Sequence, residues 1–291
     1  MSGAPQARWS GVRLLRDRIF WTSCVLAFLL IAAPTVAVLA NVFDQAAPDL
    51  GVHLLSEISN ATGGGLQNAI LGTLLLLLGV LVVAGVAGVG AGIYLAEYSP
   101  PRLGGSLRFG SEVLAGSPSI VIGYVAYMSL VVGLHWQFSL AAAVIALSVL
   151  VLPYIVKTTE VAFRQVPTSL REGAAALGVS RSRAVWSVLL PTAVPGILSG
   201  LVVALAISTG ETAPLLLTAG YINANPTFQL THRAVPYLTY VTYTDISLPG
   251  NQAHAQGAAA AAITLVILLV LIFVGRMIGS RSRRRIRGLG V

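Results

Sequence analysis

The residue with the clearest chemical potential is an acid inside an apolar stretch. Glu211 lies in the run Gly210-Glu211-Thr212-Ala213-Pro214, with apolar residues before and after it. A carboxylate in such a segment is costly and normally faces a cavity or a partner, which makes it a functional candidate. Pro214 lacks a backbone donor and crowds the carbonyl of Gly210, so a kink or break is expected beside Glu211. The exposed amides of the half-helix that follows would suit an anion.

An anion beside Glu211 raises an electrostatic difficulty, because an ionised carboxylate repels it. Three solutions are open: Glu211 is neutral, it pairs with an arginine of a companion chain, or it gates the path without binding the anion. Pairing and gating are preferred. Nearby hydroxyl groups would serve as donors, although such groups often bond a carbonyl of their own helix, and a structural role is the default for each. These hydroxyls belong to Ser117, Ser119, Ser208, Thr209 and Thr212.

A second set of residues suits recognition by another protein. The run Arg171-Glu172-Gly173-Ala174-Ala175-Ala176-Leu177-Gly178 is followed, after a further nine residues, by Val188-Leu189-Leu190-Pro191. Ser169 and Glu172 have capping-box spacing, which predicts a helix start there. Gly178 suits a left-handed C-cap, and Ser180 suits the start of a second helix. The sequence therefore predicts a helical rod of about eight residues, roughly 12 Å long.

One face of this rod is expected to bind a partner. Leu170, Ala174 and Leu177 recur at spacings of four and three, which places them on the same side of a helix. The three consecutive alanines would permit close approach, and Arg171, Arg181 and Arg183 could pair with acidic residues of a docked subunit. The alternative is a solvated helical hairpin that binds nothing.

The sequence lacks the residue patterns for ATP binding, metal binding, a disulfide bond or enzymatic catalysis. Lys157 is the single lysine and precedes Thr158 without the glycines of a Walker A loop, so this chain is not expected to bind ATP itself. The four histidines have no metal-ligand spacing, and Cys24 is the single cysteine, so neither a metal, a cofactor nor an intramolecular disulfide is expected. A membrane-embedded enzyme is disfavoured because no nucleophile with a base and no paired carboxylates are visible.

The elements that position these residues are apolar helices. The chain of 291 residues is 56% hydrophobic and 10% charged, with a mean hydropathy of +0.83. Its apolar runs reach the length of about 20 residues that spans a bilayer. The sequence predicts an all-α membrane protein with six transmembrane helices, at residues 19–42, 67–94, 109–134, 139–156, 191–219 and 256–278. The rod lies between the fourth and fifth.

Orientation follows from the basic residues, because cytoplasmic flanks retain Lys and Arg. Of the 18 basic residues, 17 fall in the tails 1–18 and 276–291 or in the connections that include the rod, and Arg233 alone falls on the other side. Both termini are therefore expected in the cytoplasm, and the net charge of +8 implies anionic lipid neighbours with no nucleic-acid partner. Segment 43–66 is expected as a flexible outer loop. Outside, Tyr221, Tyr237, Tyr240 and Tyr243 are expected at the membrane interface.

The rod with its spacing resembles the cytoplasmic coupling loop of type I ABC importers, whose pattern is Glu-Ala-Ala, three residues, Gly, nine residues, an aliphatic residue, one residue and Leu-Pro. Gly173 replaces the first alanine here. The resemblance implies a MetI-like permease fold, with a type-1 membrane domain over 67–278, a coupling loop at about 158–190 and a basic tail at 279–291. It also implies that Arg171, Glu172, Ala174, Ala175, Leu177, Gly178 and Pro191 act in coupling to a partner pair of ATPase subunits.

Two further runs sharpen the resemblance. Gly210-Glu211-Thr212-Ala213-Pro214-Leu215-Leu216 looks like the signature of the A-type permease subunits of Pst phosphate importers, and Gly116-Ser117-Pro118-Ser119-Ile120-Val121-Ile122-Gly123 is similar to a second family segment. The resemblance implies a bacterial cytoplasmic-membrane protein that pairs with a C-type permease and receives phosphate from an external binding protein. Its path or gate would include Gly210, Glu211, Thr212, Pro214, Ser117 and Ser119. Family members often carry arginine one turn before the glutamate, where this chain has Ile207.

Two other function classes stay open. The same architecture would serve another oxyanion, such as sulfate, molybdate or phosphonate. A gradient-driven transporter would instead use Glu211 as a proton carrier, since one intramembrane carboxylate can suffice. The coupling loop argues against the second class.

Overall fold

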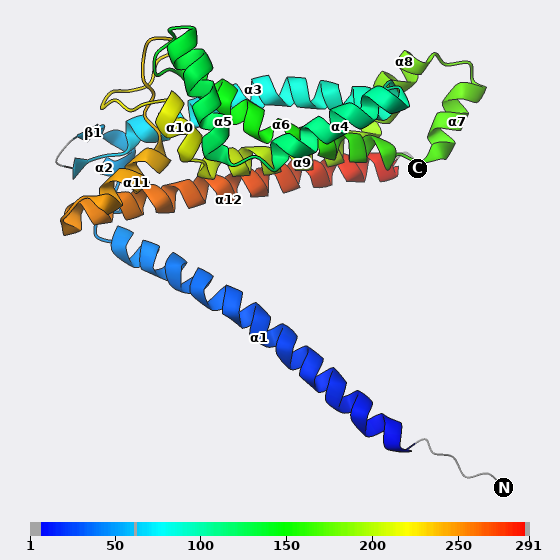
Figure 1. Ribbon diagram of the computed structural model, residues 1–291, viewed down its shortest axis with the longest axis horizontal. Coiled ribbons are helices and arrows are strands. Elements are labelled where there is room, and N and C mark those ends of the chain that lie inside the picture. The colour runs from blue at the N-terminus through cyan, green and yellow to red at the C-terminus, as the bar shows by residue number, and fades with distance from the viewer. Residues whose placement is uncertain (1–6, 61–62, 289–291) are drawn as a thin grey trace.

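The long elements of the computed structural model are apolar helices, and the structure describes residues 7–60 and 63–288 (Figure 1). Five of them are long and apolar enough to cross a membrane, and a bent pair of shorter helices would make a sixth. The prediction of a helical membrane protein is confirmed. The five are α1 (Ala7–Ala46), α3 (Gln67–Glu97), α6 (Leu140–Arg164), α9 (Leu190–Gly210) and α12 (Asn251–Gly288).

The helix predicted at 109–134 is broken, which the sequence analysis missed. Its residues belong to α4 (Pro101–Ala115), α5 (Ser119–Ala126) and the π-helical stretch η1 (Tyr127–Gly133). The two halves meet at an angle of 101°. The physical reason lies in Gly116-Ser117-Pro118, because proline cannot donate to the preceding turn and disfavours helical geometry in the residue before it.

The helix predicted at 191–219 breaks where Pro214 indicated. The α9 helix ends at Gly210, Glu211 is extended with φ −73° and ψ 132°, and the short helix α10 (Ala213–Thr218) begins with a proline in its first turn. The missing amide of Pro214 thus ends one helix and starts another.

Small elements gather at the two ends of the helix bundle (Figure 1). At one end lie α2 (His53–Ser56), the two-residue antiparallel strands β1 (Ser59–Asn60) and β2 (Gly63–Gly64), and α11 (Leu238–Ser247). The segment 43–66, expected to be a flexible loop, therefore carries ordered structure where it is described. At the opposite end lie α7 (Thr168–Ala176), α8 (Arg181–Ala184) and the π-helical turn η2 (Val185–Leu189).

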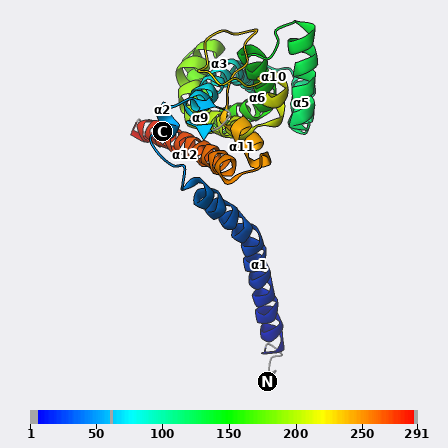
Figure 2. The ribbon, with the colours of Figure 1, turned by 90° about the vertical axis from the view of Figure 1, so that its left-hand side faces the viewer.

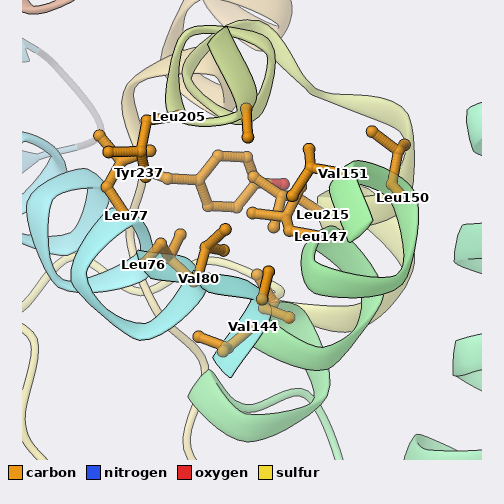
Figure 3. Close-up of a cluster of buried hydrophobic side chains, with 14 of the residues drawn as sticks. Leu76, Leu77, Val80, Val144, Leu147, Leu150, Val151, Leu205, Leu215 and Tyr237 are labelled. Atoms are coloured by element: carbon orange, nitrogen blue, oxygen red, sulfur yellow. The ribbon is translucent and has the colours of Figure 1, made fainter. Parts of the chain in front are cut away.

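The main core lies between α3, α6, α9 and α10, and Tyr237 fills its centre (Figure 3). Tyr237 is only 1% exposed, so its expected position at the membrane interface is wrong. Its ring arrives on the segment that leads into α11, where Pro236 lies against Gly72 and the Leu238 amide donates to the Thr73 hydroxyl at 3.0 Å. Those contacts draw a connection between helices into the bundle.

The helix α1 projects away from the other helices (Figure 2). Only its C-terminal end joins the packed part, where Val42 and Ala46 contact the cluster that includes Leu54 and Ala258. Cys24 is exposed on α1. The functional residues all lie on α3 to α12.

Candidate functional site

The two runs that carry the finer resemblance meet in space. The α5 helix packs against α10, and a Cβ atom added to Gly123 would lie 2.6 Å from the Cα atom of Pro214. This distance is far below van der Waals contact, so only glycine allows the two backbones this approach. Both broken helices therefore turn against each other at their breaks.

Glu211 lies at this meeting point and is partly buried. Ser119, in the first turn of α5, lies near the Glu211 carboxylate. The backbone carbonyl of Glu211, which the helix break leaves without a helical partner, accepts a hydrogen bond from Thr239 Oγ1 at 3.0 Å. Of the predicted path residues, Ser119, Glu211 and Pro214 are thus brought together.

Three of the four remaining hydroxyls bond a carbonyl of their own helix, which is the structural role expected by default. Ser208 and Thr209 are buried and donate to carbonyls one turn earlier in α9, at 2.9 and 2.7 Å. Ser117 donates to the Val113 carbonyl at 3.0 Å. Thr212 is the N-cap residue of α10 but makes no side-chain capping bond. Ser117, Ser208 and Thr209 therefore have structural roles in the conformation described, and a role on the path for Ser117 and Thr212 stays a prediction.

The hydroxyl of Thr239 gives a test of how the break is held. Thr239→Val removes the bond to the Glu211 carbonyl and leaves that acceptor without its partner, so we expect a loss of about 1 kcal/mol in stability. Thermal unfolding of the purified membrane complex measures it. The matched control is Thr242→Val, because Thr242 only donates to Leu238 within α11, at 3.2 Å. Equal melting temperatures for the two variants would show that Thr239 does not hold the break.

The rod expected between the fourth and fifth predicted spans exists as α7. It begins at Thr168, with Pro167 as its N-cap residue and no side-chain cap, so the capping box of Ser169 and Glu172 does not form. The reason is that the helix starts two residues earlier than the box requires, which moves Ser169 inside the first turn. Gly178 has φ +69°, as its expected left-handed role demands, and Ser180 precedes α8 as its N-cap residue.

The face expected to bind a partner is only partly free. Ala174 is 7% exposed, because this side of α7 packs on η2, and Leu170 contacts the cluster around Phe163 and Val185. Leu177, beyond the end of the helix, is 83% exposed. The free side of the rod consists instead of Glu172, Gly173, Ala175, Ala176 and Leu177.

Arg171 forms an ion pair within the chain. Its Nη1 atom lies 2.6 Å from Oε1 of Glu97, which is buried at the end of α3, and its Nη2 atom donates to the Phe163 carbonyl at 2.7 Å. Arg181 donates to the Glu97 carbonyl and lies over the Tyr98 ring at 5.2 Å. In this chain the two arginines tie the rod and α8 to the end of α3, and their expected contacts with a partner stay a prediction.

A second buried carboxylate was missed by the sequence analysis. Glu160, 4% exposed, accepts from Arg108 on α4 at 2.7 Å and lies 2.8 Å from Arg164, one turn further along α6. The four-residue spacing of Glu160 and Arg164 was the available signal. Glu112 pairs on the surface with Lys157 at 3.6 Å, while Arg108 pairs with Glu160.

Metal binding finds no support in the part of the chain that the structure describes, because no group of three His, Cys, Asp or Glu side chains is placed to hold an ion.

Comparison with known proteins places residues 88–288 in one family, described as the binding-protein-dependent transport system inner membrane component. The phosphate transport system permease protein PstA 2 of Mycobacterium bovis is 47% identical over 273 residues, which cover 94% of this chain and 91% of the relative.

Solved structures agree on the fold. A chain of the MetNI methionine ABC transporter in an inward-facing conformation has a TM-score of 0.59 and 20% identity, covering 75% of this chain and 95% of its own. A chain of a bacterial ABC transporter involved in alginate import has a TM-score of 0.64 and 15% identity, covering 95% and 99%. At these identities the likeness concerns the fold alone.

Proposed function

The chain belongs to the family of binding-protein-dependent transport system inner membrane components, and from that membership we propose that it is the permease subunit of an ATP-driven phosphate importer. The substrate rests on the 47% identity to a phosphate transport permease over nearly the whole of both chains. The chain forms part of a path through the membrane, and the chemical step, ATP hydrolysis, belongs to a partner.

One observation carries the mechanism. The α9 helix runs without interruption from η2, next to the coupling rod, to Gly210, next to the break at Glu211. Its 21 residues correspond to roughly 30 Å of rigid rod. A movement imposed at α7 and α8 is therefore delivered at the contact between α5 and α10.

The other contacts of the rod strengthen this transmission. Arg171 joins α7 to Glu97 of α3, and Arg108 joins α4 to Glu160 of α6. Both carboxylates are buried, and buried ion pairs resist separation because each charge would be left without its partner. The ends of α3, α4 and α6 consequently move with the rod rather than independently of it.

The assembly that follows has four kinds of partner. We assign a C-type second permease across the path, a pair of ATPase subunits beneath the rods, an external phosphate-binding protein at the α2–α11 end, and lipid around the helices. Both termini lie in the cytoplasm, on the side where basic residues concentrate. ATP binds only to the ATPase subunits. Closure of that pair draws the rods together and opens the path outward, and hydrolysis resets it inward.

The test is transport by the reconstituted complex. Proteoliposomes that hold this chain with its partner subunits and an enclosed ATP supply should accumulate radiolabelled phosphate. An excess of unlabelled phosphate should suppress the uptake, whereas sulfate, molybdate or phosphonate should not. Stronger suppression by one of those three would assign the permease to that oxyanion instead.

The free side of the rod gives a prediction on assembly. Leu177→Asp places a charge at an 83% exposed apolar side chain, where it disturbs no internal packing but opposes burial under a partner. We expect the permease to keep its melting temperature and to bind the ATPase subunits at least about tenfold more weakly, measured by co-purification and titration, since burying an unpaired charge costs more than 1.4 kcal/mol.

Arg183→Asp tests the same interface from α8, because Arg183 is exposed, makes no ion pair with another described residue and is expected to pair with acidic residues of the ATPase subunits, so it should weaken their binding as well. Undiminished ATPase binding by Leu177→Asp would remove this end of the rod from the interface.

A further inference from the structure

A large groove to which no role has been assigned runs between α9 and α12. Its volume is about 1100 Å³. The α9 wall includes Ser199, Val203 and Ile207, and the α12 wall includes Ile272, Arg276 and Ser280. The two helices touch at its base, where a Cβ atom on Gly275 would lie 2.1 Å from Cγ2 of Val202.

The groove continues the line of Glu211. On a helix, residues four apart lie one above the other, so Ser199, Val203, Ile207 and Glu211 form one row along α9. Three members of that row line the groove, and the fourth stands at the helix break. The groove therefore begins at Ile207, one turn before the break, and runs toward the end of α9 that follows η2. In Figure 1 that end of the bundle holds α7 and the end of α12.

Arg276 is the one charged residue in the lining. Among the described residues it has no ion pair. The two serines in the walls donate to carbonyls of their own helices, Ser199 to Pro195 at 3.0 Å and Ser280 to Met277 at 2.9 Å. They would have to turn before they could donate to a ligand. The guanidinium is therefore the group that defines the chemistry of the groove, and guanidinium groups favour carboxylate and phosphate.

The distance between Arg276 and Glu211 determines how strongly the carboxylate repels an anion bound at Arg276. The contact between Gly275 and Val202 places Arg276 level with Val202, nine residues before Glu211, or roughly 14 Å along the helix axis. In a hydrated path this exceeds the screening length of about 8 Å at physiological salt. An anion at Arg276 would thus escape most of the repulsion of the carboxylate.

We infer that Arg276 is the anion-contacting cation of this chain on the rod side of the gate, and that the α9–α12 groove is the part of the path in which a phosphate group meets it. The inference rests on the proposed function and names a residue for it. The other source of the same chemistry is the headgroup of an anionic lipid, with its acyl chains along Val203 and Ile207.

The experiment probes the charge that a small reagent meets in the groove. Cys24→Ser removes the single cysteine, and Val203→Cys, at a position 49% exposed, introduces a target in the reconstituted full complex. Anionic sulfonatoethyl and cationic trimethylammonioethyl methanethiosulfonates are then compared by their rates of modification. We expect Arg276→Gln to lower the anionic-to-cationic rate ratio about tenfold, and Arg276→Lys to restore most of it.

Arg18→Gln is the matched control, because it removes an exposed arginine from α1, far from the groove, and should leave the ratio unchanged. In the Val203→Cys complex that retains Arg276, millimolar inorganic phosphate should slow modification by the anionic reagent. The same phosphate should have no effect on modification in the Arg276→Gln variant. An anionic-to-cationic rate ratio that is the same with and without Arg276 would overturn the inference. A thiol that reacts with neither reagent would also overturn it.

The lipid arm uses vesicles with and without phosphatidylglycerol. Protection of the thiol by phosphatidylglycerol but not by inorganic phosphate would also overturn the inference and assign Arg276 to a headgroup. Failure of the proposed function is seen separately: the unmodified complex would not accumulate phosphate, while the dependence of the rate ratio on Arg276 would persist.

Discussion

Gly123→Ala is expected to stop phosphate accumulation, although it adds one methyl group. That methyl would lie 2.6 Å from the Cα atom of Pro214 and 3.1 Å from its Cβ atom. The obstacle is backbone, so α10 must move away from α5, at a cost of about 1–3 kcal/mol. We expect uptake to fall at least about tenfold, with a lower melting temperature, because the displaced segment carries the Glu211 gate.

A second glycine-to-alanine variant shows whether the loss of uptake and of melting temperature comes from the close contact at Gly123. Gly110→Ala lies in α4, where nothing approaches the new Cβ atom within 4 Å. Alanine is favoured over glycine in a helix by about 1 kcal/mol, so this variant should transport normally and melt no lower than the parent. If Gly123→Ala behaved like Gly110→Ala, the close contact of α5 and α10 would not be required for function.

Breaking the pair of Glu97 and Arg171 is expected to separate ATP hydrolysis from transport. Arg171→Ala leaves the Glu97 carboxylate, whose side chain is 6% exposed, without its partner at 2.6 Å. Loss of one member of a buried pair costs 3–5 kcal/mol, and about 2 kcal/mol is appropriate here because the Arg171 side chain is 31% exposed. The rod then detaches from α3, so we expect ATP turnover to continue while phosphate imported per ATP falls at least about tenfold.

Two further variants separate this effect from a general loss of stability. Arg102→Ala removes an exposed arginine of α4 that makes no ion pair with another described residue, and it should leave the ratio of phosphate to ATP intact. The double variant Glu97→Ala with Arg171→Ala should be less damaging than the sum of the single variants, because no unpaired charge remains. Additive losses, or a normal ratio in Arg171→Ala, would contradict the anchoring role.

The sequence was sufficient where one residue determines local geometry. Pro214 placed the break beside Glu211, and Gly178 placed the end of the rod, because a missing amide and a left-handed φ are properties of single residues. Pro118 indicated a break in the same way, but the apolar run around it was predicted to be one helix. Hydropathy alone does not distinguish one straight helix from two bent halves.

The contacts that depend on tertiary structure were not predictable. Glu97 and Arg171 are 74 residues apart, and nothing in their neighbourhoods indicates that they pair. Ala174 matched a docking face by its spacing, yet the packing of α7 on η2 buries it. Tyr237 appeared to be an interfacial tyrosine because its connecting segment gives no sign that it re-enters the core.

ATP-dependent uptake with the proton gradient abolished is the most direct test of the account. Proteoliposomes containing the full complex and the external binding protein would be treated with a protonophore, and radiolabelled phosphate would be followed with and without enclosed ATP. The account predicts accumulation that requires ATP, survives the protonophore and is lost in Gly123→Ala. Accumulation without ATP or the ATPase subunits, and collapse on addition of the protonophore, would show instead a gradient-driven transporter in which Glu211 carries the proton.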